Sequence, residues 1–98
     1  MKFLDQAELQ DAAECLRTLA HPHRLRMLQM LFTGAFTVGE LAKACGIQSH
    51  MASEHLRLMR DRGMLESQRQ GRKIYYSVVA PELHDILACL EKKYDMSR

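Results

Sequence analysis

Apolar residues recur three and four positions apart at the start of the chain, which is the spacing of one helix face. A first helix is therefore predicted over residues 5–19, with its apolar stripe formed by Leu9, Ala12, Ala13, Leu16 and Leu19. A second helix is predicted to begin at Pro22, behind the cap His21, and to end at Gly34. Its inner face is expected to consist of Leu25, Leu28, Leu31 and Phe32.

Two more helices are predicted in the middle of the chain. Thr37 and Glu40 form a capping-box pattern at the start of the segment VGELAKAC, and a glycine follows that segment. The next helix is expected to use Gln48 or Ser49 as its cap. The pair, with its tight glycine-containing turn, predicts a helix-turn-helix over about 37–62.

The period then changes from that of a helix to that of a strand. Strand-favouring residues lie on both sides of Gly71, in a shorter run at 65–69 and a longer run at 74–79. They predict a β-hairpin, or wing, over about 65–79. Its tip is expected to consist of Gln70, Gly71, Arg72 and Lys73.

A last helix is predicted over about 81–94, because Pro81 precedes apolar residues at helical spacing. The predicted fold class is therefore mainly α with a small β-hairpin, a winged helix-turn-helix in the order α-α-α-α-β-β-α. Residues 1–98 are expected to form one domain. A chain of 98 residues builds only a modest core, so burial against a second copy, through the terminal helices at 5–19 and 81–94, would add to it.

Composition excludes several classes of protein. Hydrophobic residues make up 47% and charged residues 27%, which is ordinary for a globular protein. No apolar run approaches the roughly 18 residues of a membrane span, and the acidic start does not resemble a signal peptide, so a cytoplasmic protein is expected. The sequence shows no paired carboxylates, no nucleophile with a base and no glycine-rich phosphate loop, so neither an enzyme nor a cofactor is predicted.

Charge is unevenly distributed along a chain whose net charge is only +2. Residues 48–73 contain six basic and three acidic side chains, whereas residues 1–20 contain two basic and four acidic ones. A positive segment on a nearly neutral body is typical of a protein that meets a polyanion with one face. The alternative is a charged face that is merely solvated.

The helix after Gly46 has two different faces. Its inner face is expected to comprise Ala52, His55, Leu56 and Met59, with His55 a packed, hydrogen-bonded histidine rather than a ligand. Its outer face is expected to comprise His50, Ser53, Glu54, Arg57 and Asp61. Short donors and acceptors at a helix start suit base edges in a major groove, and arginines suit phosphates. Base contacts are therefore predicted for Ser49, His50, Ser53 and Glu54, and phosphate contacts for Arg57 and Arg60. The wing residues Arg72 and Lys73 are predicted to contact the DNA backbone or the minor groove, the alternative being solvated charge.

Three segments together resemble the ArsR/SmtB family of bacterial winged helix-turn-helix repressors: LAHPHRLRMLQML, ELAKACGIQSHMASEHLRLMRDRGML and GRKIYYSV. The resemblance spans about Leu16 to Val79. It implies a homodimer joined through the first and last helices, a palindromic operator in double-stranded DNA, and release by a metal ion or a thiol-reactive signal. By position, the DNA contacts it implies are Gln48, Ser49, His50, Ser53, Glu54, Gln70, Arg72 and Lys73.

The sequence departs from the family at the effector sites. Thr37 and Gly39 stand where arsenic and cadmium sensors have Cys-x-Cys, and the zinc-sensor positions fall on Ala80, Glu82, Lys93 and Met96. A register shifted by two gives Glu82, His84, Asp95 and Arg98. No metal site is therefore predicted.

Three separate cysteines without a C-x-x-C pair predict free thiols. Cys15 and Cys89, which the dimer would bring into one region, are candidate thiol sensors, although buried cysteine is often only a small apolar residue, and Cys45 is expected to be structural. The alternative function is a dimerising winged-helix module that binds a protein or RNA partner.

Overall fold

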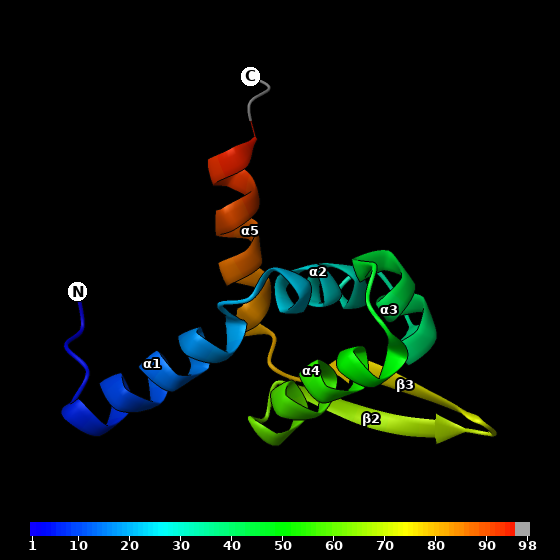
Figure 1. Cartoon of the computed structure of the whole chain (residues 1–98). Coiled ribbons are helices and arrows are strands. Elements are labelled where there is room, and N and C mark those ends of the chain that lie inside the picture. Colours follow the sequence, from blue (N-terminus) through cyan, green and yellow to red (C-terminus); the bar gives the residue numbers. More distant parts are fainter. Residues whose placement is uncertain (96–98) are drawn as a thin grey trace.

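The computed structural model describes residues 1–95 and has five helices and a three-stranded sheet within that range (Figure 1). In chain order the elements are α1 (Gln6–Leu19), α2 (Pro22–Leu31), β1 (Phe36–Thr37), α3 (Val38–Cys45), α4 (Ser49–Asp61), β2 (Leu65–Gln70), β3 (Lys73–Val78) and α5 (Glu82–Tyr94). Met96 and Arg98, which the two zinc registers invoked, lie outside the described residues. We call α4 the reading helix and the β2–β3 hairpin the wing.

The hydrophobic core lies among α2, α3, α4 and the base of the wing, and it also includes the end of α1 and the first half of α5. Met27, Leu28, Leu41, Leu56, Met59 and Leu83 are its largest fully buried side chains. The predicted inner positions Ala52, Leu56 and Met59 of the reading helix are completely buried. This burial fixes the rotation of α4 about its axis, so the opposite face must point outward.

The sheet contains one strand that the sequence did not predict. β3 lies in the centre of an antiparallel sheet in the order β1-β3-β2. β1 has only two residues, Phe36 opposite Tyr76 and Thr37 opposite Tyr75, and two residues are too few to show strand alternation. Gly71 turns the wing at a φ of 65°, a left-handed conformation that glycine adopts without steric penalty. Through β1, the wing is paired to the residues immediately before α3.

Helix caps follow the sequence in most places. Thr37 and Glu40 form the predicted capping box of α3. At the start of α2, the His21 Nδ1 accepts a hydrogen bond from the His23 backbone N–H at 3.1 Å. These contacts satisfy backbone N–H groups that have no partner within the helix.

Of the two predicted caps of α4, Gln48 occupies the cap position, and Ser49 is the first residue of the helix. Gln48 makes no side-chain capping bond, so the N–H groups at this helix start are not occupied by a cap side chain. One predicted boundary was wrong: α2 was expected to end at Gly34 but ends at Leu31, and a turn containing a Thr33 hydroxyl bond to the Met30 carbonyl follows it. The turn leads directly into β1.

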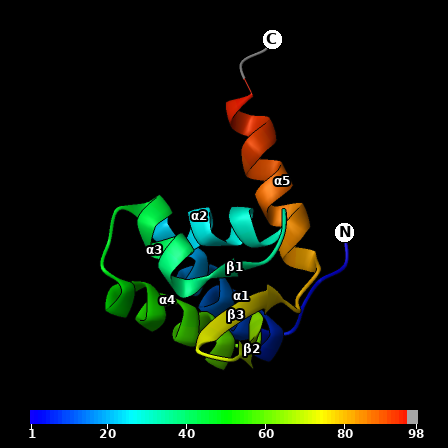
Figure 2. The same ribbon diagram turned by 90° about the vertical axis from the view of Figure 1, so that its right-hand side faces the viewer.

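The terminal helices extend away from the body of the molecule (Figures 1 and 2). Leu16 of α1 is 54% exposed and Tyr94 of α5 is 68% exposed, and Phe3 before α1 is 92% exposed. Apolar surface of this kind is typical of a face that another chain covers. None of the helices in the described part of the chain is long and apolar enough to cross a membrane.

Candidate nucleic-acid interface

The start of the reading helix presents short polar side chains to solvent. Gln48, Ser49, His50 and Glu54 are exposed and Ser53 is half-buried. The turn at Gly46, with a φ of 68°, ends α3 and redirects the chain so that α4 starts at the surface. The predicted outer face is thus confirmed as the accessible one.

The wing meets this helix around one hollow. A depression of about 370 Å³ is lined by Thr37, Val38, Gly39, Ser53, Arg72, Lys73 and Ile74. Residues far apart in the sequence therefore border one surface: the middle of α4, the start of α3 and the wing tip (Figure 2). The contribution of α3 was not predicted, because the capping box at Thr37 indicates only local structure. The predicted contacts Gln48, Ser49, His50 and Gln70 are exposed but do not line the hollow.

The basic side chains near the end of α4 have different partners. Arg57 is exposed and makes no ion pair within the described residues. Arg60 lies 3.4 Å from the Asp61 carboxylate, in a solvent-exposed pair. Arg62 instead pairs with Glu14 of α1, next to the Glu14–Arg17 pair. Arg57 is therefore the cation of this group that is most available to an external anion.

The positive wing tip lies close to the cap of α3. Hydrogen bonds from the Thr37 backbone and hydroxyl lower the pKa of the Glu40 carboxyl, and the positive charge of Lys73 lowers it further. The Glu40 carboxylate stays ionised, but its oxygen is engaged by the Thr37 N–H. Arg72 and Lys73 have no ion pair within residues 1–95.

The inner side of α4 contains the histidine that the sequence predicted to be packed. The His55 Nδ1 accepts a hydrogen bond from Arg24 Nε at 3.0 Å, and its ring centroid lies 4.5 Å from that of His21. His55 is therefore a packed, hydrogen-bonded histidine, as predicted. The sequence analysis did not identify Arg24, because a contact between residues 31 positions apart leaves no periodic signal.

The cysteines occupy three different environments. Cys15 is half-buried, and burial, with the charges of Asp11 and Glu82, raises the pKa of its thiol. Cys89 is exposed. Burial likewise raises the pKa of Cys45, whose Sγ lies 3.8 Å from the His23 carbonyl oxygen. Within the described residues, no three His, Cys, Asp or Glu side chains are arranged to hold a metal ion.

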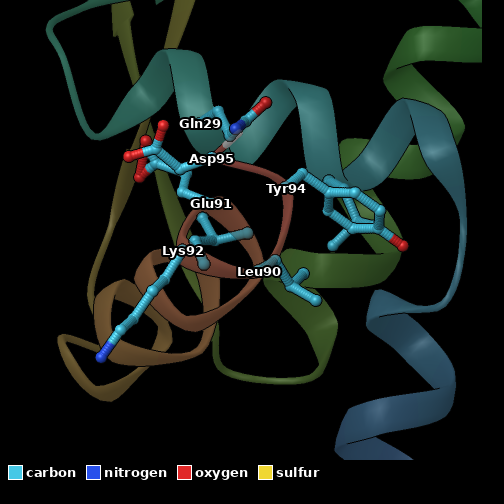
Figure 3. Close-up of a pocket in the computed structure, with 8 residues that line it drawn as sticks. Gln29, Leu90, Glu91, Lys92, Tyr94 and Asp95 are labelled. Carbon is cyan, nitrogen blue, oxygen red and sulfur yellow. The ribbon is translucent and has the colours of Figure 1, made fainter. Parts of the chain in front are cut away.

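A second concave surface lies between α2 and α5 (Figure 3). It is a groove of about 700 Å³ whose apolar walls include Leu25 of α2 and Leu87, Leu90 and Tyr94 of α5. The groove is formed along the projecting helix α5, on the other side of the molecule from the reading helix and wing (Figure 1). It belongs with the exposed apolar surface of the terminal helices.

Known proteins share both the sequence and this arrangement. A family model described as a helix-turn-helix domain matches residues 19–68. The HTH-type transcriptional regulator YgaV of Escherichia coli strain K12 is 38% identical over 90 residues, covering 91% of each chain. The transcriptional repressor PagR of Bacillus anthracis is 34% identical over 88 residues, covering 89% of this chain and 88% of the relative.

The fold also matches solved structures of regulators. One is the solution structure of the homodimeric winged helix-turn-helix DNA-binding domain of Mb0332 from Mycobacterium bovis, described as a possible ArsR-family transcriptional regulator. It matches with a TM-score of 0.78 and 26% identity, covering 99% of this chain and 93% of that one. With this fold, the exposed polar reading helix and the cationic wing, the chain belongs to the ArsR/SmtB family of winged helix-turn-helix transcriptional regulators.

Proposed function

We propose that this protein is a homodimeric repressor that binds a palindromic operator in double-stranded DNA and leaves it when an inducer acts. The observation that carries the proposal is the shared hollow, which is lined by Ser53 of the reading helix and by Arg72 and Lys73 of the wing. A polar helix and a cationic hairpin on one surface can contact a major groove and the adjacent backbone together. The proposal assigns the chain no catalytic role and places its action in the cytoplasm, where bacterial DNA lies.

The proposed contacts divide into two kinds. Ser49, His50, Ser53 and Glu54 would meet base edges, because their short side chains donate and accept hydrogen bonds near the helix start. Gln48 and the uncapped N–H groups of α4 would meet a phosphate, since a helix N-terminus favours an anion. The remaining phosphate contacts are proposed for Arg57, Arg60, Gln70, Arg72 and Lys73.

Dimerisation is proposed to use α1 and α5. Both helices expose leucines in the single chain, Leu9 and Leu16 on α1 and Leu90 on α5. α1 is mainly acidic, and only the last turn of α5, with Lys92 and Lys93, offers the opposite charge. PagR is named a repressor and the Mb0332 domain is homodimeric, which supports both parts of the proposal.

The test is binding to a duplex selected from a random DNA pool, measured by fluorescence anisotropy at several salt concentrations. Six to eight phosphate contacts should make log K fall with log salt at a slope of roughly −5 to −7. The bound species should contain two protomers. Equal competition by RNA, or a slope near zero, would contradict the proposal.

Thiol sensing is proposed through Cys15 and Cys89. Because exposed Cys89 is accessible and the pKa of Cys15 is raised, a thiol reagent at neutral pH should modify Cys89 first. Replacing both cysteines with serine should abolish any release of DNA by oxidants or polysulfide while leaving DNA binding intact. Release that persists in the double variant would eliminate these two thiols as sensors.

A further inference from the structure

A cluster of three imidazoles and one guanidinium lies under the reading helix. The rings of His21, His23 and His55 have centroids 4.5 to 6.0 Å apart, and His55 accepts the Arg24 hydrogen bond described above. His21 and His23 flank Pro22 at the start of α2, whereas His55 belongs to α4. The cluster therefore joins the α1–α2 connection to the DNA-facing helix.

Arg24 contacts two elements at the same time. Its Nε donates to the His55 Nδ1 of α4, and its Nη1 donates to the Thr18 carbonyl oxygen near the end of α1, both at 3.0 Å. A carbonyl in the last turn of a helix has no intrahelical donor, so a basic side chain is a favourable partner there. The planar guanidinium can hold both acceptors in fixed directions, which a lysine ammonium does less well.

The bond to His55 needs a neutral imidazole. Nδ1 accepts from Arg24 through its lone pair, and a proton on that nitrogen occupies the same lone pair. A protonated ring would also place a second positive charge beside the Arg24 guanidinium. Acid must therefore break this contact and convert it into a repulsion.

The surroundings of His55 favour the neutral ring. Burial lowers the pKa of His55 from its ordinary value of 6.5, and the charges of Arg24, His21 and His23 lower it further, whereas Glu54 of the same helix raises it. Burial, Arg24 and His23 also lower the pKa of His21, whose Nδ1 caps α2. Neutral His55 thus stabilises the fold above pH 6.5, and this stabilisation is lost as the pH falls through the lower folded-state pKa.

We propose that Arg24 is a positioning residue for DNA binding, which holds the reading helix against the end of α1 through His55, and that acid releases this contact and weakens operator binding. The inference rests on the proposed function, because it concerns the orientation of the helix that meets the bases. His55 is on the inner face, so it acts through the position of Ser53 and Glu54 rather than on DNA.

The variant His55→Asn tests whether protonation of His55 causes the loss of binding in acid. The Asn Oδ1 can take the place of the imidazole Nδ1 and accept from Arg24, but an amide does not titrate. Arg24→Lys removes the two-way contact while keeping the charge. His84→Gln is the matched control, since His84 is an exposed histidine on α5 whose ring contacts Phe32.

The four proteins are compared by their affinity for one duplex at about pH 7.5 and about pH 5.5, at constant ionic strength. Wild type and His84→Gln should bind more than about threefold more weakly at the lower pH, because protonation of His55 removes the Arg24 bond and replaces it with a repulsion. His55→Asn should bind like wild type at the higher pH and change less than about threefold on acidification. Arg24→Lys should bind more weakly at the higher pH.

Exposed His50 is unchanged in all four proteins, so any effect it has on binding is common to them. An acid response of His55→Asn equal to that of wild type would overturn the proposal, as would full affinity of Arg24→Lys at the higher pH. Failure of every variant and of wild type to bind any duplex would instead refute the proposed function.

A measurement without DNA tests the Arg24–His55 contact directly. It separates failure of this inference from failure of the proposed DNA-binding function. Hydrogen exchange of the backbone amides of α4 in wild type, corrected for the intrinsic pH dependence, should be at least about threefold faster at the lower pH, because the helix loses its contact with Arg24. The faster exchange is expected whether or not the protein binds DNA. The measurement uses only wild type, so it can be made even if His55→Asn does not fold. Unchanged protection of α4 between the two pH values would overturn the proposal.

Discussion

Among single residues, the arginines at the end of the reading helix show how position decides the role of a charge. Arg57 is exposed and has no ion pair with any residue from 1 to 95, whereas Arg62, five residues later, contacts Glu14 of α1. These arginines have the same charge, but only Arg57 can neutralise a phosphate without first losing a carboxylate partner. Exposed ion pairs are worth little in stability, so the difference concerns binding rather than folding.

Arg57→Ala is expected to weaken binding to all duplexes alike and to make the salt slope less steep by about 1, the loss of one phosphate contact. Arg62→Ala is the matched control and should leave the slope nearly unchanged, because Arg62 is engaged with Glu14. Anisotropy titrations at several salt concentrations measure both. Equal slopes for Arg57→Ala and wild type would remove Arg57 from the interface.

Glu54→Ala should act differently, because an exposed carboxylate near the helix start can accept a hydrogen bond from a cytosine amino group. We expect altered preference at one base position of each half-site, by about 1–3 kcal/mol, with nearly the same salt slope. Selection of bound duplexes from a randomised pool measures this preference. An unchanged preference at every position would show that Glu54 does not meet a base.

Among the elements, the turn between α3 and α4 requires a left-handed backbone conformation at Gly46. Gly46 has a φ of 68°, where an L side chain is strained even though a Cβ would meet no atom within 4 Å. Gly46→Ala should therefore lower the free energy of unfolding by about 1 kcal/mol. Gly34→Ala is the matched control, because Gly34 has open space and no left-handed φ. Urea unfolding followed by circular dichroism compares them, and equal losses would contradict the explanation.

The elements that the sequence predicted were those with long local patterns. Helices α1, α4 and α5 each have at least 13 residues with apolar positions at helical spacing, and strand-favouring residues lie on both sides of Gly71. β1 was missed because two residues have no period. The sequence left Gln48 and Ser49 as alternative caps, because local preference favours serine there while the turn after Gly46 decides the position, and the structure has Gln48.

The candidate site was predictable to a similar extent. Helical period separated the exposed face of α4 from the buried one, and charge located the wing tip. The Arg24–His55 and Arg62–Glu14 contacts could not be predicted, because they join residues 31 and 48 positions apart through tertiary packing. Local sequence carries little information on such pairs.

For the molecule as a whole, the exposed leucines of α1 predict that a second protomer covers this helix in a dimer. Leu16 is 54% exposed in the single chain, and burial in a dimer interface would remove that apolar surface from water. Leu16→Glu should shift the protein from twice its chain mass of 11.3 kDa to the monomer mass in analytical ultracentrifugation. Leu58→Glu, at a leucine of α4 that is 39% exposed, is the matched control and should stay dimeric. If both variants are monomers, or if both are dimers, α1 does not form the dimer interface in this way.

The pairing of Phe36 and Thr37 with β3 limits how an inducer can act. The wing is hydrogen-bonded to β1, which directly precedes α3, and α3 packs against the reading helix. The wing and the reading helix of one protomer should therefore move together as one rigid unit. A signal at the terminal helices would then change the distance or the tilt between the rigid units of the two protomers, without changing the structure of either unit. Released protein should accordingly retain the wing's strand pairing while no longer matching half-sites about 34 Å apart.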